Sequence, residues 1–145
     1  MHATGERIDY LATFHFTVEV EGIAKAHFTE CSGLQAEAEV FSYEEGGCNY
    51  YIHKLPGRIK FSNLTLKRGV SANDDLWLWF QKVIQGSIER KNVSVILHNP
   101  DDTEAKRWNF FRAYPVKFVS PNLVSDQSQT SIEIMELAHE GMSLA

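Results

Sequence analysis

The stretch from Glu44 to Gly69, EEGGCNYYIHKLPGRIKFSNLTLKRG, follows two segments in which polar and apolar residues alternate. It contains glycines at positions 46, 47, 57 and 69, which suit the positive-φ or close-approach conformations of turns. Its first part is far longer than a two-residue hairpin turn, and ordering a long loop costs conformational entropy. We therefore expect a long loop or hairpin at 44–57 that contacts either a ligand or another chain.

The composition is that of a folded protein of modest size. The chain has 145 residues, of which 43% are hydrophobic and 12% aromatic, so a core can form without stapling disulfides. We expect a single domain spanning residues 1–145. No apolar run approaches the roughly 18–20 residues that cross a bilayer, and the first residues lack a signal-peptide pattern. The chain is therefore expected to fold in a cytoplasm, without direct membrane insertion.

Charged residues are segregated along the chain. Residues 1–49 carry nine acids and two bases, residues 50–117 six acids and twelve bases, and residues 118–145 four acids and no base. Blocks of opposite sign suit a molecule that meets copies of itself head to tail, although acidic and basic strands could equally pair within one subunit. The net charge of −5 and the pI of 5.6 argue against nucleic-acid binding.

Alternating polar and apolar residues predict a mainly β protein. Strands are expected at 14–20, in a second segment ending near Cys31, and at 34–41, 50–55, 59–66, 93–97, 108–118 and 132–138. Pro56–Gly57 is expected to separate two of them, and Pro115 indicates an edge or a bend. The expected fold is a small antiparallel β-barrel or two packed sheets with one flanking helix.

The helix is predicted at about residues 73–85. Residues 76–80 are five consecutive apolar side chains, which is more than one face of a helix presents. Either they belong to one large aromatic core, or at least one of Leu78 and Trp79 is buried by a second chain.

Side chains that could carry catalysis or bind a metal form no recognisable motif. The six histidines are not at metal-ligand spacing, and the sequence has no nucleophile elbow or phosphate-binding glycine loop. A Cys31–histidine pair stays open as an alternative. So does a pair of carboxylates among positions 19, 21, 37 and 39, although these acids lie on polar strand faces that suit solvent or a water-filled channel. Cys31 and Cys48 are expected to be free thiols, and we expect no enzyme activity, cofactor or metal.

Short motifs follow one another along the chain: 30–34 (ECSGL), 45–47 with Asn49 (EGGxN), 55–57 (LPG), 63–69 (NLTLKRG), 76–79 (LWLW), Trp108 with 113–115 (AYP), and 136–142 (ELAHEGM). In this order they resemble the tail-tube proteins of contractile-tailed phages. That family includes the inner-tube proteins of phage-derived extracellular contractile injection systems. The resemblance covers about residues 14–142, nearly the whole chain.

The resemblance implies a structural subunit. Six copies would close into a ring, rings would stack into a hollow tube inside a contractile sheath, and contraction would drive the tube through a target envelope. The implied partners are the sheath protein, baseplate or spike proteins and tube-terminating proteins, with DNA or a protein effector as lumen cargo. Assembly in the bacterial cytoplasm would yield part of a phage virion tail or of an injection particle.

Contacts between subunits and between rings are expected from the 44–57 segment, the basic residues that follow it, and the helix. The expected interface residues are Glu45, Gly46, Gly47, Asn49, Tyr50, Tyr51, Leu55, Pro56, Gly57, Arg58, Lys67, Arg68, Leu78 and Trp79. Two alternatives are kept. One is the secreted tube protein of the type VI system, with the same fold, and the other is a cytoplasmic ligand-binding β-barrel, which predicts a monomer with an apolar interior pocket.

Overall fold

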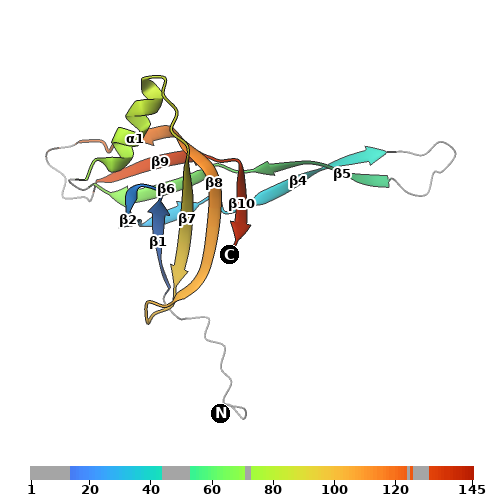
Figure 1. Ribbon diagram of the computed structural model, residues 1–145, viewed down its shortest axis with the longest axis horizontal. Helices are drawn as coiled ribbons and strands as arrows, with labels where there is room; N and C mark the ends of the chain where they lie inside the picture. Colours follow the sequence, from blue (N-terminus) through green and yellow to red (C-terminus); the bar gives the residue numbers. More distant parts are fainter. Residues whose placement is uncertain (1–13, 44–52, 71–72, 124, 126–130) are drawn as a thin grey trace, which may run out of the picture.

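The computed structural model describes residues 14–43, 53–70, 73–123, 125 and 131–145, and these residues form ten strands and one helix (Figure 1). The strands are β1 His15–Val20, β2 Ile23–His27, β3 Glu30–Ser32, β4 Ala36–Tyr43, β5 His53–Phe61, β6 Leu64–Gly69, β7 Lys91–His98, β8 Glu104–Val119, β9 Ile132–Ala138 and β10 Gly141–Leu144. The helix α1 is Asp75–Ile84. The mainly β class and the single helix expected near 73–85 are confirmed in the described part of the chain. At ten residues, α1 is not long and apolar enough to cross a membrane.

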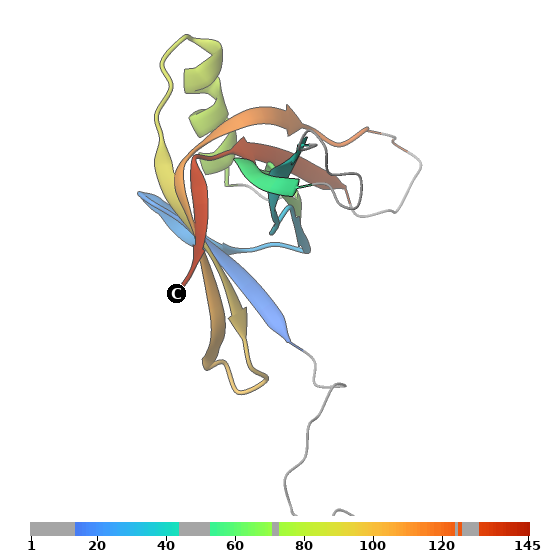
Figure 2. The ribbon, with the colours of Figure 1, turned by 90° about the vertical axis from the view of Figure 1, so that its right-hand side faces the viewer.

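Eight strands form one antiparallel sheet in the order β2-β1-β7-β8-β9-β6-β3, with β10 also paired to β8. Strand β8 organises this sheet, because β7 pairs with one edge of its first part while β10 and then β9 pair with its other edge. Figure 2 shows β8 curving from the part beside β7 to the part beside β9. Among the described residues β2 and β3 stay unpaired with each other, so the sheet is bent over itself without closing into a barrel.

The bend of β8 coincides with a residue in a left-handed conformation. Arg112 has a φ of 52°, which costs a non-glycine residue about 1–2 kcal/mol. Two contacts hold it there: its backbone N–H donates to Asn92 Oδ1 at 3.2 Å, and its side chain forms an ion pair with Glu140 at 2.7 Å. The bend indicated by Pro115 therefore begins three residues earlier, at Arg112.

The core fills the space between the two halves of the bent sheet, and α1 closes one side of it. The alternation of each strand sends every second residue inward. The buried cluster consists of Val18, Val20, Phe28, Leu64, Leu66, Leu76, Trp79, Val93, Val95, Phe110, Ala113, Met135 and Leu137. Burying one such large apolar side chain contributes roughly 1.5–3 kcal/mol, so this cluster is the main source of stability.

Strands β4 and β5 form a separate two-stranded sheet, here called the β4–β5 arm (residues 36–43 and 53–61), which extends away from the body (Figure 1). The expected interruption at Pro56–Gly57 is absent, since β5 runs through both residues and accommodates them with a bulge at Gly57–Arg58, opposite Glu39. The break falls instead between Phe61 and Leu64. A two-stranded sheet tolerates Pro56 because each strand has a free edge, where a missing N–H costs no ladder hydrogen bond.

Candidate assembly surfaces

The β4–β5 arm exposes apolar side chains that the described part of the subunit does not cover. Its most exposed apolar residues are Val40 (58%), Phe41 (58%), Leu55 (51%) and Ile59 (55%). Gly57 allows the two strands to approach, because a Cβ there would lie 2.9 Å from the Phe41 ring and from the carbonyl oxygen of Glu39. An isolated two-stranded hairpin is marginally stable in water. The arm is therefore suited to packing against another surface.

Basic side chains accompany these apolar residues along β5. Lys54, Arg58 and Lys60 are all exposed. Lys60 Nζ lies 2.7 Å from Glu39 Oε1 across the arm, whereas Lys54 and Arg58 form no ion pair with another described residue. Within the described part of the chain, the arm thus presents two positive charges without an ion-pair partner.

Helix α1 lies at the top of the body, away from the arm, which extends to the right (Figure 1). Asn73 Oδ1 accepts a hydrogen bond from the Asp75 N–H at its start, and Gly86, with a φ of 88°, follows its end. Trp79 is 2% exposed, and its Nε1 donates to the Glu89 carbonyl at 2.7 Å. Leu78 is 52% exposed. Trp79 is thus buried by its own core, and the prediction that a second chain buries one of this pair now concerns Leu78 alone.

A hollow of about 170 Å³ opens beside α1, between the helix and the β1–β2 turn. Its lining combines the apolar side chains of Ile23, Leu78 and Trp79 with the charged ones of Asp75, Lys82, Glu89 and Lys91. We call this hollow the α1 socket.

Among the described residues, some charged side chains of the α1 socket have an ion-pair partner and one does not. Lys82 Nζ lies 2.5 Å from Glu89 Oε2, and Lys91 Nζ lies 3.0 Å from Glu89 Oε1. The hydrogen bond from Lys82, followed by that from Lys91, lowers the pKa of Glu89. Asp75, by contrast, forms no ion pair with another described residue. Its carboxylate is the one that the socket leaves without a cation.

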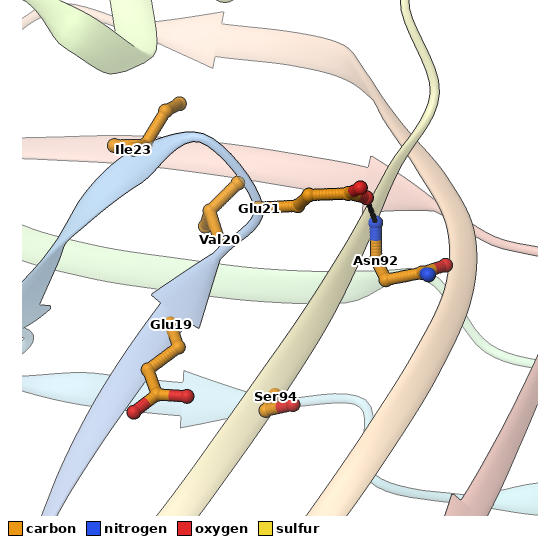
Figure 3. A pocket seen from close by; sticks show the side chains of 6 residues that line it. All are labelled: Glu19, Val20, Glu21, Ile23, Asn92 and Ser94. Atoms are coloured by element: carbon orange, nitrogen blue, oxygen red, sulfur yellow. Dashed lines mark hydrogen bonds between the residues drawn. The ribbon is translucent and has the colours of Figure 1, made fainter.

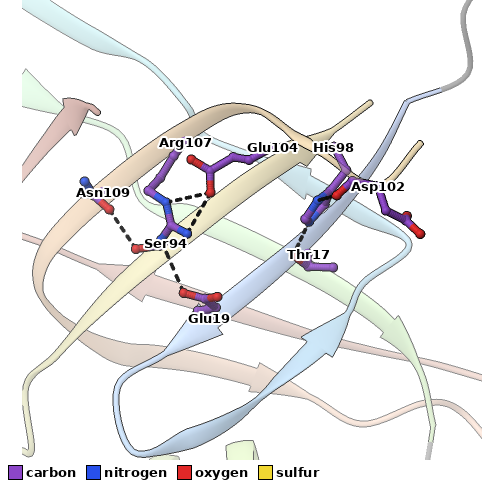
Figure 4. A network of polar contacts seen from close by, with 8 residues as sticks. All are labelled: Thr17, Glu19, Ser94, His98, Asp102, Glu104, Arg107 and Asn109. Carbon is purple, nitrogen blue, oxygen red and sulfur yellow. Dashed lines mark hydrogen bonds and ion pairs between the residues drawn. The ribbon is translucent and has the colours of Figure 1, made fainter. Parts of the chain in front are cut away.

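The face of β1, β7 and β8 that points away from the core is polar. Arg107 donates to Glu104 at 2.9 Å and to Glu19 at 3.3 Å, and these hydrogen bonds, the one to Glu104 first, raise the pKa of Arg107 (Figure 4). On the same face Ser94 donates to Asn109 at 2.7 Å. A polar sheet face backed by a core suits a water-filled channel, as the sequence predicted for the acids of this strand.

A second polar cluster lies farther along the same strands (Figure 4). His98 Nε2 is hydrogen-bonded to Thr17 Oγ1 at 2.8 Å, and both residues are buried. His15 stacks on the His98 ring with centroids 4.9 Å apart and lies 2.8 Å from Asp102. Among the described residues, no group of three or more His, Cys, Asp or Glu side chains is arranged to hold a metal ion.

The acids at alternating positions do not form a catalytic pair. Glu19 is bound by Arg107, and Glu21 accepts a hydrogen bond from the Asn92 N–H at 3.0 Å beside an open hollow of about 410 Å³ with a mixed polar and apolar lining (Figure 3). Glu37 and Glu39 lie on the arm, in a different sheet. An acid catalyst needs an apolar pocket that keeps it protonated, and neither pair has one.

Cys31 is a free thiol beside the core. Burial raises its pKa to about 12, so the thiolate that a nucleophile requires is strongly disfavoured. Cys48 lies outside the described residues.

Apart from Leu78 and Trp79 on α1, the expected interface residues fall into three groups. Glu45, Gly46, Gly47, Asn49, Tyr50 and Tyr51 lie outside the described residues. Leu55, Pro56, Gly57 and Arg58 lie together on the arm. Lys67 is half-buried near Glu30, with 3.4 Å between their charged atoms, and Arg68 is 8% exposed and held inside the subunit. Sequence reasoning missed Val40, Phe41 and Ile59, because alternation alone does not reveal that their strands leave the main sheet.

The comparison with known proteins decides the family. The chain matches the family model described as T4-like virus tail tube protein gp19 over residues 12–143. The chain belongs to this tail-tube family. No curated protein gives a match to it.

Solved structures similar to this chain cover almost all of it. A chain of the anti-feeding prophage baseplate, solved by cryo-EM with six-fold symmetry, is 26% identical, with 97% of both chains covered and a TM-score of 0.81. A chain of the sheath–tube complex of the extracellular contractile injection system PVC is also 26% identical, covering 90% of this chain and 88% of that chain at a TM-score of 0.81. Hcp1 from Flavobacterium johnsoniae shares the fold alone, at 16% identity, with 90% and 94% covered and a TM-score of 0.58.

Proposed function

We propose that this tail-tube protein is a non-catalytic structural subunit, that six copies close into a ring, and that rings stack into the hollow inner tube of a contractile apparatus. The observation that carries this proposal is the family match across residues 12–143. The exposed apolar arm supports it, since such an arm is costly in an isolated subunit and useful in an assembly.

The proposed partners are taken from the assemblies that contain the similar chains. Those chains come from a baseplate, a sheath–tube complex and a tube-terminating cap. We propose the same partners here: a contractile sheath protein around the tube, baseplate or spike proteins at one end and a terminator at the other. Assembly in the bacterial cytoplasm, with DNA or a protein effector in the lumen, belongs to the same proposal.

The type VI secretion tube is the second candidate. Proteins of that system share the fold at 10–16% identity, with TM-scores between 0.55 and 0.64. The injection-system chains reach 25–26% identity and TM-scores of 0.81–0.83. The latter comparison favours a tube that stays part of a phage tail or an injection particle.

The test is a deletion within the 44–57 segment. Deleting residues 46–56 takes away the start of β5 but no strand of the main sheet, so we expect a folded subunit that forms no tubes. Negative-stain microscopy at high concentration would compare the deletion with the parent, and thermal unfolding would check the fold.

Leu123→Ser is a matched control, because Leu123 is 88% exposed and lies outside the arm and the α1 socket. It should form tubes like the parent. Normal tubes from the deletion variant would remove the arm from the assembly mechanism. A parent that stays monomeric at every concentration would contradict the proposed function itself.

A further inference from the structure

We propose that the α1 socket receives the β4–β5 arm of a second copy of this chain, with Arg58 of the arm facing Asp75 of the socket. This inference rests on the proposed ring and tube function and assigns the two surfaces that meet in it.

The placement of the two surfaces suits a contact between copies. The arm extends sideways from the body, and α1 lies at the top of it, away from the arm (Figure 1). A protrusion and a hollow on different surfaces of one subunit can form a head-to-tail contact, in which each copy gives its arm to one neighbour and its socket to another. Such a contact continues into a closed ring or an open filament without a two-fold axis.

The apolar parts of the two surfaces match in size. The socket holds about 170 Å³ beside Ile23 and the half-exposed Leu78. A cavity of about 150 Å³ accommodates a group of the size of benzene, so the socket fits one large apolar side chain. On the face that carries Arg58 the arm offers Phe41 and Leu55, both more than half exposed. Inserting one of them would cover Leu78 and that arm residue together.

The charges are complementary as well. In the socket Glu89 is occupied by both lysines, which leaves Asp75 as the carboxylate without a cation among the described residues. In the arm Arg58 lies on the same face as Phe41 and Leu55, and it has no carboxylate partner among the described residues. Docking the arm would give both groups a partner, and a desolvated guanidinium–carboxylate pair is stronger than one at the rim.

A charge exchange tests this pairing. Arg58→Glu and Asp75→Arg should each raise the critical concentration for tube formation by about 5–30-fold, because each single variant places like charges together. The variant carrying both substitutions restores opposite charges and should return to within about two-fold of the parent. Light scattering and microscopy at about 0.15 M salt would measure these values.

Asp74→Arg is the matched control, since it introduces the same charge at the same helix end but does not line the socket. It should assemble like the parent. If Asp75→Arg raises the critical concentration for tube formation more than Asp74→Arg does, the difference does not come from the helix dipole. Thermal unfolding would confirm that all variants fold. If the double variant is as impaired as the product of the two single effects, the Arg58–Asp75 pairing is wrong, while tubes formed by the parent leave the proposed function standing. A parent without tubes would contradict both.

Discussion

Arg68 joins three parts of the subunit through one buried side chain. From β6 its guanidinium forms an ion pair with Glu133 on β9, donates to the Asn73 carbonyl ahead of α1 at 3.1 Å, and lies 5.6 Å from the centre of the Phe28 ring. Its neighbour Lys67 points to the other side of the strand, where it lies near Glu30. Adjacent basic residues thus have opposite roles, one in the interior and one at the surface.

Removing Arg68 should therefore act on folding. Arg68→Ala leaves Glu133 half-buried without its cation, and we expect a loss of about 3–5 kcal/mol in the free energy of unfolding. Lys67→Ala, the matched surface change, should cost about 0–1 kcal/mol. Urea denaturation of both variants would measure the difference. Equal losses in the two variants would show that the Arg68–Glu133 pair is not a structural contact.

The sequence alone could not show which of Lys67 and Arg68 is buried. Its period of two requires that Lys67 and Arg68 face opposite sides, but it does not say which one faces inward. A buried arginine is acceptable only with a partner, and Glu133 lies 65 residues away on a strand whose register appears only in the folded sheet. Position 68 was therefore placed among the expected contacts between subunits.

At the scale of elements, the turn between β3 and β4 depends on a glycine. Gly33 has a φ of 95°, and a Cβ on it would lie 2.0 Å from the carbonyl oxygen of Asn63, in the turn between β5 and β6. The two turns are thus in backbone contact, which fixes where the arm leaves the body. This explains physically why the ECSGL motif has glycine at that place.

Alanine at Gly33 should be strongly destabilising. We expect Gly33→Ala to cost about 3–5 kcal/mol, of which 1–2 arise from the left-handed backbone and the rest from the clash with Asn63. Gly86→Ala is the matched control, because Gly86 has a φ of 88° but nothing within 4 Å of its added Cβ. It should cost about 1–2 kcal/mol. Similar values for the two variants in urea denaturation would contradict the close approach of the turns.

Most elements could be predicted because their repeat of polar and apolar residues involves only positions close together in the sequence. Alternation identified β1, β4, β7 and β9 closely, and the apolar stripe of Leu76, Phe80, Val83 and Ile84 identified the helix. The prediction failed at Pro56–Gly57, where turn-forming residues lie inside a strand. A proline interrupts a strand only if its N–H is needed by a neighbour, and the sequence does not show that β5 has a neighbour on one edge only.

At the scale of the whole molecule, the arm should behave differently in isolated and assembled subunits. Lys54, Arg58 and Lys60 are exposed on a two-stranded sheet that opens readily by itself. We expect trypsin to cut after these residues in dilute subunits and to be at least about ten-fold slower in tubes. Mass spectrometry of timed digests would follow each bond, with the urea-unfolded chain as the reference for complete accessibility. Equal rates in tubes and in subunits would mean that assembly does not cover the arm.

The family could be predicted from the order of the motifs, whereas the surfaces could be predicted only in part. The 44–57 segment correctly drew attention to the arm, yet its exposed apolar residues extend to Val40 and Ile59 on both sides of it. Asp75 gave no signal, because an acid in the first turn of a helix is ordinary. Its proposed role depends on the ion pairs of Lys82 and Lys91 with Glu89, which are evident only in the folded structure.

The long strand β8 has a mechanical consequence. Its sixteen residues are hydrogen-bonded to β7 along one edge and to β10 and β9 along the other. A force directed along β8 loads these bonds side by side in shear, so they share it, whereas a force that peels a hairpin from its end breaks bonds one after another. A tube pushed through an envelope must carry thrust without yielding. In this subunit β8, paired along both edges, is the strand best suited to resist a force directed along its length.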